Sequence, residues 1–209
     1  MSNTKEEIEF KWSVKSPEQF GDFREAAKAA GAKLGSPQSR HNHDLYLDTA
    51  KGALEKSKIT CRLRDCNGRF EMTIKAASKL KGGLARRSEK NIPLEGVRKA
   101  DAALALVRDL YHHPATNGDQ LEVRFSISNN RRDLDLSLPG AFKAQVSFDE
   151  VAINAGLKTV GMREIEMEFL EGNLRKFLDF ARQMTKKAGL LPARMSKVAT
   201  ARAAIKYLH

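Results

Sequence analysis

Hydrophobic and polar residues alternate along much of the chain with the period of two that is typical of β-strands. The alternation is clearest near the N-terminus, where Ile8, Phe10, Trp12 and Val14 stand between charged or polar neighbours. The same pattern predicts further strands at residues 44–48, 59–64, 70–75, 87–94, 121–127, 134–138, 142–149 and 164–169. Most of the chain is therefore expected to form antiparallel sheet.

Turn and helix signals separate these strands. Asn-Gly or similar pairs predict turns at residues 67–68, 129–130 and 139–140. Pro17 and Glu18 suit the first turn of a helix. Together with the apolar spacing, such signals predict helices at residues 17–30, 98–111, 173–188 and 195–207.

The polar faces of the strands carry Glu, Arg and Lys at nearly every position. This high number of charged residues indicates how the strands are arranged. A solvated sheet with solubilising charges would explain any single strand. However, the amphipathic helices need apolar strand faces to cover, so the charged faces are expected to point inward. An eight-stranded barrel has room for side chains or one small ligand. We therefore expect an α+β fold: an eight-stranded antiparallel β tunnel, closed as a barrel, with a polar interior and flanking helices, forming one domain over residues 1–209.

Composition narrows the range of partners. With 37 Lys and Arg against 26 Asp and Glu, the formal charge of +11 favours an anionic partner, which could be nucleic acid, an anionic membrane or a small polyanion. No apolar run is long enough for a transmembrane helix. The N-terminal segment lacks the apolar core of a signal peptide, and two cysteines cannot staple a domain of this size. A cytoplasmic location without membrane contact is therefore expected.

Acidic and basic residues are grouped on different strands. Glu7 and Glu9 share one face of the first strand, and Glu164 and Glu166 share one face of the last. Hard oxygen ligands without His or Cys suit Mg²⁺ or Mn²⁺. The middle strands carry cations suited to binding phosphate, namely Arg62, Arg64, Lys75, Arg87 and Arg124. An acidic and a basic wall facing each other predict a site for a metal-bound polyphosphate.

The segment Glu7-Ile8-Glu9-Phe10-Lys11 resembles the ExExK signature of the triphosphate tunnel metalloenzymes, or CYTH superfamily. The resemblance continues in order through Arg62-Leu63-Arg64, Lys75, the Arg87/Glu89 pair, Arg124, Asp149, Glu164-Ile165-Glu166 and Ser196-Lys197. It implies metal ligands at Glu7, Glu9, Asp149, Glu164 and Glu166. It implies phosphate contacts at Lys11, Arg62, Arg64, Lys75, Arg87, Arg124 and Lys197, with Arg202 as a further candidate. The catalytic set would be Glu7, Glu9, Lys11, Glu166 and Lys197.

The resemblance implies hydrolysis of a triphosphate, most simply inorganic tripolyphosphate, with Mg²⁺ or Mn²⁺. A class IV-type adenylate cyclase acting on ATP and a thiamine triphosphatase are the enzyme alternatives. A polyphosphate- or nucleic-acid-binding module without catalysis is the alternative outside enzymes. Nucleic acid is the less favoured partner, because the aromatic residues fall mostly on apolar faces and not among the basic ones. A homodimer remains possible.

Overall fold

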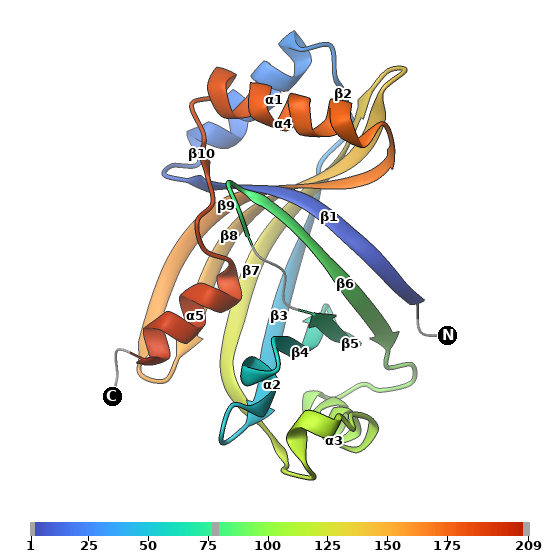
Figure 1. Cartoon of the computed structure of the whole chain (residues 1–209), viewed down its shortest axis with the longest axis vertical. Helices are drawn as coiled ribbons and strands as arrows, with labels where there is room; N and C mark the ends of the chain where they lie inside the picture. Colours follow the sequence, from blue (N-terminus) through green and yellow to red (C-terminus); the bar gives the residue numbers. More distant parts are fainter. Residues whose placement is uncertain (1–2, 77–79, 207–209) are drawn as a thin grey trace.

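Eight antiparallel strands close into a barrel whose order is β1-β6-β5-β4-β3-β7-β8-β9, with β9 pairing back to β1 (Figure 1). The computed structural model describes residues 3–76 and 80–206. The barrel strands are β1 (Asn3–Val14), β3 (Gln38–Thr49), β4 (Ile59–Cys66), β5 (Arg69–Ala76), β6 (Leu84–Pro93), β7 (Leu121–Leu138), β8 (Phe142–Ala155) and β9 (Lys158–Gly172). Two short strands, β2 (Lys33–Leu34) and β10 (Leu191–Pro192), pair with β7 and β1. The predicted closed barrel is confirmed.

Helices lie at both ends of the barrel and across one side of it (Figure 1). They are α1 (Glu18–Ala29), α2 (Ala53–Lys56), α3 (Ala100–Leu110), α4 (Leu174–Lys187) and α5 (Lys197–Lys206), with a 3-10 turn at Pro114–Thr116. The short α2 was not predicted, and Tyr207 at the predicted end of the last helix lies outside the described residues. No helix in the described part of the chain is long and apolar enough to cross a membrane.

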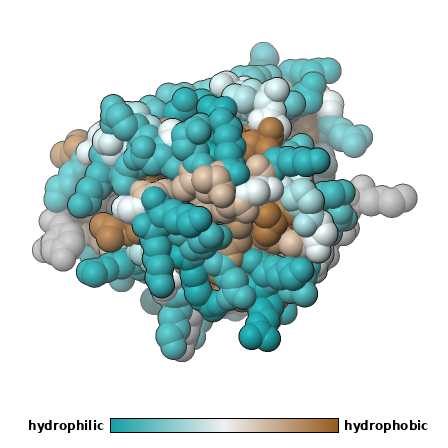
Figure 2. All heavy atoms as spheres, turned by 90° about the horizontal axis from the view of Figure 1, so that it is seen from above, coloured by the Kyte–Doolittle hydropathy of each residue, from teal (hydrophilic) through white to brown (hydrophobic). Residues whose placement is uncertain are grey.

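The outward strand faces are apolar and form two cores with these helices. At one end, Trp12, Phe23 and Phe177 are fully buried between α1, α4 and strands β1, β8 and β9. Seen from above, this end is covered mostly by hydrophilic residues, with hydrophobic ones visible between them (Figure 2). At the other end, Leu63 and Met72 pack against α3. Burying these faces against helices leaves the charged faces of the same strands for the interior.

Strand β7 is a single strand of 18 residues, so the turn predicted at Asn129-Asn130 is wrong. Asn129 pairs with Asn42 on β3 and with Val151 on β8, which places it in the middle of the sheet. Asn129 and Arg131 line the interior, while Asn130 is exposed outside. Because both faces are polar here, the sequence loses the alternation that marks a strand and reads as a turn.

A β-bulge in β7 changes which side chains face inward. Leu47 pairs with Val123 and Tyr46 with Phe125, so Arg124 is one extra residue in the strand. Side chains on either side of a bulge switch faces. As a result, Leu121 belongs to the outer core beside α3, whereas Phe125 belongs to a core on the inner face.

The inner face of the barrel is apolar where α5 lies against it. Val151 and Ile153 share a strand face with Asp149, which contacts Lys197 at the start of α5. Together with Ile127, they pack against Ala201 of α5. The expectation of a uniformly polar interior therefore holds for the tunnel but not for the part of the barrel that α5 fills.

Candidate active site

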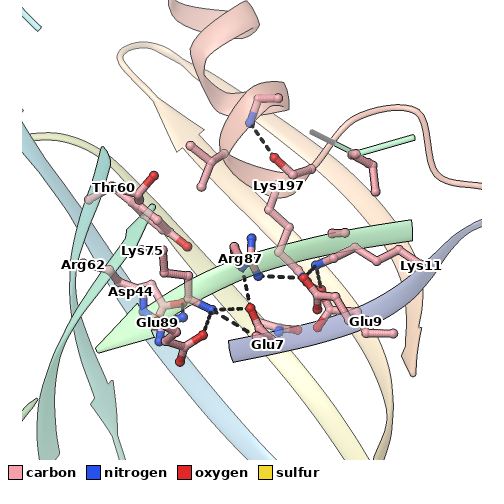
Figure 3. Close-up of a pocket in the computed structure, with 18 of the residues that line it drawn as sticks. Glu7, Glu9, Lys11, Asp44, Thr60, Arg62, Lys75, Arg87, Glu89 and Lys197 are labelled. Carbon is pink, nitrogen blue, oxygen red and sulfur yellow. Dashed lines mark hydrogen bonds and ion pairs between the residues drawn. The ribbon is translucent and has the colours of Figure 1, made fainter. Parts of the chain in front are cut away.

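The barrel encloses a cavity of about 720 Å³, lined mainly by charged side chains. All eight barrel strands and α5 contribute residues to this lining. We call this cavity the tunnel. Every second residue of a strand points to the same face, so the alternating segments deliver their charges to it. Figure 3 shows how these side chains converge from several strands.

The two glutamates of β1 that line the tunnel, Glu7 and Glu9, lie among cations. Arg87 on the neighbouring β6 donates to a carboxylate oxygen of Glu7, and its Nη2 donates to Oε1 of Glu9 at 2.7 Å (Figure 3). Lys75 Nζ lies 3.4 Å from Glu7 Oε2 and 2.5 Å from Glu89 Oε2. Glu9 also lies 3.1 Å from Lys11 Nζ. These ion pairs stabilise charged groups that would be costly to bury without a partner.

Three carboxylates from β8 and β9 form a separate cluster, the carboxylate triad of Asp149, Glu164 and Glu166. All three are buried, and one oxygen of each lies within 4.8 Å of the others. The ammonium group of Lys197 reaches into this triad from the start of α5. Its Nζ lies 2.7 Å from Asp149 Oδ2 and 3.0 Å from Glu166 Oε1, and it also contacts Glu164.

The triad fits a divalent metal ion. Oε2 of Glu164 is buried and, among the described residues, has no hydrogen-bond partner. Burial, with repulsion from Glu166, raises the pKa of Glu164 to about 7, because a third carboxylate is hard to ionise in this position. Carboxylate oxygens are the donors that Mg²⁺ and Mn²⁺ prefer. A divalent cation would supply the positive charge that Lys197 now provides.

Cations hold Glu166 ionised. Burial alone would raise its pKa, but Lys11, Lys197 and Arg131 together keep it well below the usual range. Arg131 also forms a bidentate pair with Asp149, with Nε–Oδ1 at 2.6 Å and Nη2–Oδ2 at 2.5 Å. Cationic side chains therefore also lie on the wall of the tunnel that carries the acidic residues.

On the opposite wall of the tunnel, Arg62 and Arg64 share one acidic partner, Asp44. Arg64 makes a bidentate pair with Asp44, with both N–O distances at 2.7 Å. Arg62 donates to Thr73 at 2.8 Å and lies 3.5 Å from Asp44. Burial would raise the pKa of Asp44, but the two arginines hold it below its ordinary value. Burial next to Arg87 and Arg62 lowers the pKa of Lys75. One carboxylate thus orients two guanidinium groups that remain partly available to an anion.

Most of the predicted site residues come together. Ten of them line the tunnel directly, and Asp149 and Glu164 are fully buried in contact with Lys197: the lining set is Glu7, Glu9, Lys11, Arg62, Arg64, Lys75, Arg87, Glu166, Lys197 and the further candidate Arg202. Arg124 is the exception. It is exposed, lies 3.5 Å from Glu122 and lines a separate side pocket. The bulge at Arg124 is the physical reason, because it turns this residue away from the tunnel.

Two residues of the site were missed from the sequence. Arg131 directly follows the turn predicted at Asn129-Asn130, although its spacing of two from Asn129 and Asp133 is the signal of an inward face. Asp44 begins the strand predicted at residues 44–48, and its position two residues before Tyr46 puts both side chains on the inward face. Both pair with residues that were predicted, Arg131 with Asp149 and Asp44 with Arg64.

A closed antiparallel barrel with an acidic and a basic wall around one tunnel defines a class of proteins that can hold a small, highly charged anion. The chain belongs to the CYTH domain family, whose model matches residues 5–201. This confirms the resemblance that the ExExK motif and the later motifs indicate.

Individual relatives agree with this family. The chain is similar to the inorganic triphosphatase of Haemophilus influenzae, with 31% identity over 137 residues, which are 66% of this chain and 38% of that protein. A putative adenylyl cyclase from Hippeastrum, whose structure is described as revealing a dominant triphosphatase activity, has a TM-score of 0.62 at 20% identity, covering 95% of this chain and 96% of its own. A putative adenylate cyclase from Bacillus halodurans has a TM-score of 0.58 at 20% identity, covering 93% and 95%. At such identities the structural likeness shows the fold.

Proposed function

We propose that this protein hydrolyses a triphosphate, with inorganic tripolyphosphate as the substrate, and that it does so with Mg²⁺ or Mn²⁺ bound. The observation that carries the proposal is the tunnel itself, in which a row of cations faces a buried carboxylate triad. Phosphoryl transfer depends mostly on positioning and on electrostatic stabilisation, and these are what such an arrangement provides. The similarity to an inorganic triphosphatase supports the choice of substrate.

The carboxylates would hold the metal. Asp149, Glu164 and Glu166 have oxygens close enough to share one cation, while Glu9 is linked to Glu166 through Lys11. Glu7 lies further along β1, beside Lys75 and Arg87. A bound Mg²⁺ or Mn²⁺ supplies positive charge beside the phosphate oxygens.

The cations would bind and orient the phosphates. Arg62 and Arg64 offer guanidinium forks that match phosphate oxygens, and Lys11, Lys75 and Lys197 act as point charges. In the reaction, a water oxygen bonds to the terminal phosphorus while the bond from that phosphorus to the bridging oxygen breaks. The products are phosphate and pyrophosphate. Charge that develops on the transferred group and on the leaving oxygen lies within reach of these cations, which lowers the barrier.

The test is phosphate release from tripolyphosphate with Mg²⁺ or Mn²⁺, run beside ATP and thiamine triphosphate and with a cyclic AMP assay. We expect release of phosphate from tripolyphosphate that stops when the metal is chelated. Cyclic AMP formed from ATP would favour a cyclase, an activity for which two structurally similar proteins are named. The absence of turnover on all three substrates would reject the proposal in favour of a binding module.

A further inference from the structure

A second cavity opens beside the tunnel, where the β3–α2 turn, β7 and α5 meet. It has a volume of about 240 Å³, and we call it the side pocket. Its lining and that of the tunnel share Tyr46, Glu55, Thr60, Arg202 and Lys206, so the two cavities are neighbours across a common wall. None of the roles proposed for the tunnel uses the residues that belong to the side pocket alone.

The cations of the side pocket are poorly neutralised compared with those of the tunnel. Arg202 and Lys206, which lie one helical turn apart on α5, share the single carboxylate of Glu55 at 3.4 and 3.5 Å. Arg124 lies 3.5 Å from Glu122. Charge-assisted hydrogen bonds are normally about 2.7–2.9 Å long. These guanidinium and ammonium groups are therefore held loosely and retain capacity for an anion.

The second acid of the pocket, Asp48, forms an ion pair with none of these cations among the described residues. Both oxygens of Asp48 accept backbone N–H groups, those of Thr49 and Leu54 at 2.7 and 2.8 Å and that of Glu55 at 2.9 Å. Asp48 thus fixes the turn into α2. The pocket is left with more positive charge than its own acids can balance.

Size and shape favour a phosphate group over a nucleobase. A volume of about 240 Å³ falls below the ~300 Å³ at which pockets for drug-sized ligands begin. The two aromatic residues, Tyr46 and Phe125, are buried and already stacked on each other, with ring centroids 4.6 Å apart and an angle of 15°. Stacking a base would need an available aromatic face.

We propose that the side pocket is a second phosphate subsite, in which Arg124, Arg202 and Lys206 bind one phosphate group next to the tunnel. The β-bulge gives this site its arginine, because it places Arg124 outside the tunnel and on the wall of the side pocket. The group has two sources: the fourth phosphate of a linear polyphosphate whose first three lie in the tunnel, or free inorganic phosphate. The first source rests on the proposed function, and the second does not.

The test measures equilibrium binding by calorimetry, with metal chelated so that nothing turns over. The probes are tripolyphosphate, tetrapolyphosphate and inorganic phosphate, and the variant is Arg124→Gln, because Arg124 lines the side pocket but not the tunnel. Arg182→Gln is the matched control, since it removes an exposed arginine on α4 that lines neither cavity. Each variant is first compared with the wild type by circular dichroism.

A fourth phosphate in the pocket predicts that Arg124→Gln weakens binding of tetrapolyphosphate about tenfold and leaves binding of tripolyphosphate within twofold. Free phosphate as the ligand predicts that the variant weakens binding of inorganic phosphate and affects both polyphosphates alike. The proposal is overturned if the ratio of the two polyphosphate affinities and the binding of phosphate are both the same in Arg124→Gln as in the wild type. A wild-type protein that binds these anions but hydrolyses none with metal would instead reject the proposed function.

Discussion

Lys197 Nζ lies 2.7 Å from Oδ2 of Asp149, at the point where three buried carboxylates converge. The ammonium group is thus placed where a divalent cation would bind. Contacts with the triad hold the pKa of Lys197 well above its ordinary value even though burial alone would lower it, so the group stays charged. A metal ion that enters the triad must displace this side chain or share its ligands, which gives a direct test of the site.

Replacing Lys197 with Met should strengthen metal binding. Removing the ammonium group leaves buried carboxylates without their neutralising charge, and removing one partner of a buried ion pair typically costs about 3–5 kcal/mol of stability. A metal ion then restores the balance, so Mn²⁺ should bind about tenfold more tightly, as measured by electron paramagnetic resonance titration. Lys186→Met, which changes a lysine near the end of α4, is the control. Equal Mn²⁺ affinity in Lys197→Met and the wild type would contradict metal binding at the triad.

Replacing Glu166 with Gln should remove most of the proposed triphosphatase activity while the fold is retained. Glu166 contacts Lys11, Arg131 and Lys197 at once, so its charge both completes the triad and orders three cations. Loss of one preorganised electrostatic group costs roughly 10²–10³ in kcat. The check is phosphate release at saturating tripolyphosphate. Glu171→Gln, at the exposed end of the same strand, should keep full activity.

Asp44→Asn should destabilise the protein at neutral pH but not in acid. Folding lowers the pKa of Asp44 below its ordinary value of 3.8, through Arg62 and Arg64. A group of this kind stabilises the fold above its unfolded pKa, and this stability is lost as the pH falls through the folded pKa. The difference in unfolding free energy between the wild type and the variant should thus be constant from pH 7 to about pH 5 and shrink below about pH 4. Urea denaturation at each pH measures it, and a difference that does not change with pH would argue against the ion pair.

The two free cysteines should differ in reactivity. Burial raises the pKa of Cys61 to about 12, and the thiolate is the reactive form, so almost none is present at pH 8. Cys66 is only partly buried, at the end of β4. Iodoacetamide should therefore label Cys66 in the native protein and both residues after denaturation, as read by mass spectrometry. Rapid native labelling of Cys61 would show that the outer core beside α3 opens readily.

The alternation of polar and apolar residues along the strands predicted the larger part of the fold and of the candidate site. From Glu7 to Trp12 in β1 and from Glu164 to Phe169 in β9, charged and apolar residues alternate, so the glutamates of each segment could be assigned to one face. Inward and outward residues are not predicted correctly where the period of two breaks. One extra residue in β7 reverses the faces around Arg124, and polar residues on both faces hide Arg131. A two-residue alternation of polar and apolar residues predicts neither a bulge nor the packing of α5 against the inner face of the barrel.

The pairing of β1 with β9 affects the stage of folding at which the tunnel forms. Lys11 and Glu166, which join the first and last barrel strands, are separated by 155 positions in sequence. Contacts between such distant segments carry a large loop-closure cost and form late in folding. A chain still being synthesised, or one that has lost its last strand, therefore has no tunnel to offer an anion. The triphosphate binding that we propose would appear only when the ring of strands is complete, and it would report on the integrity of the whole barrel.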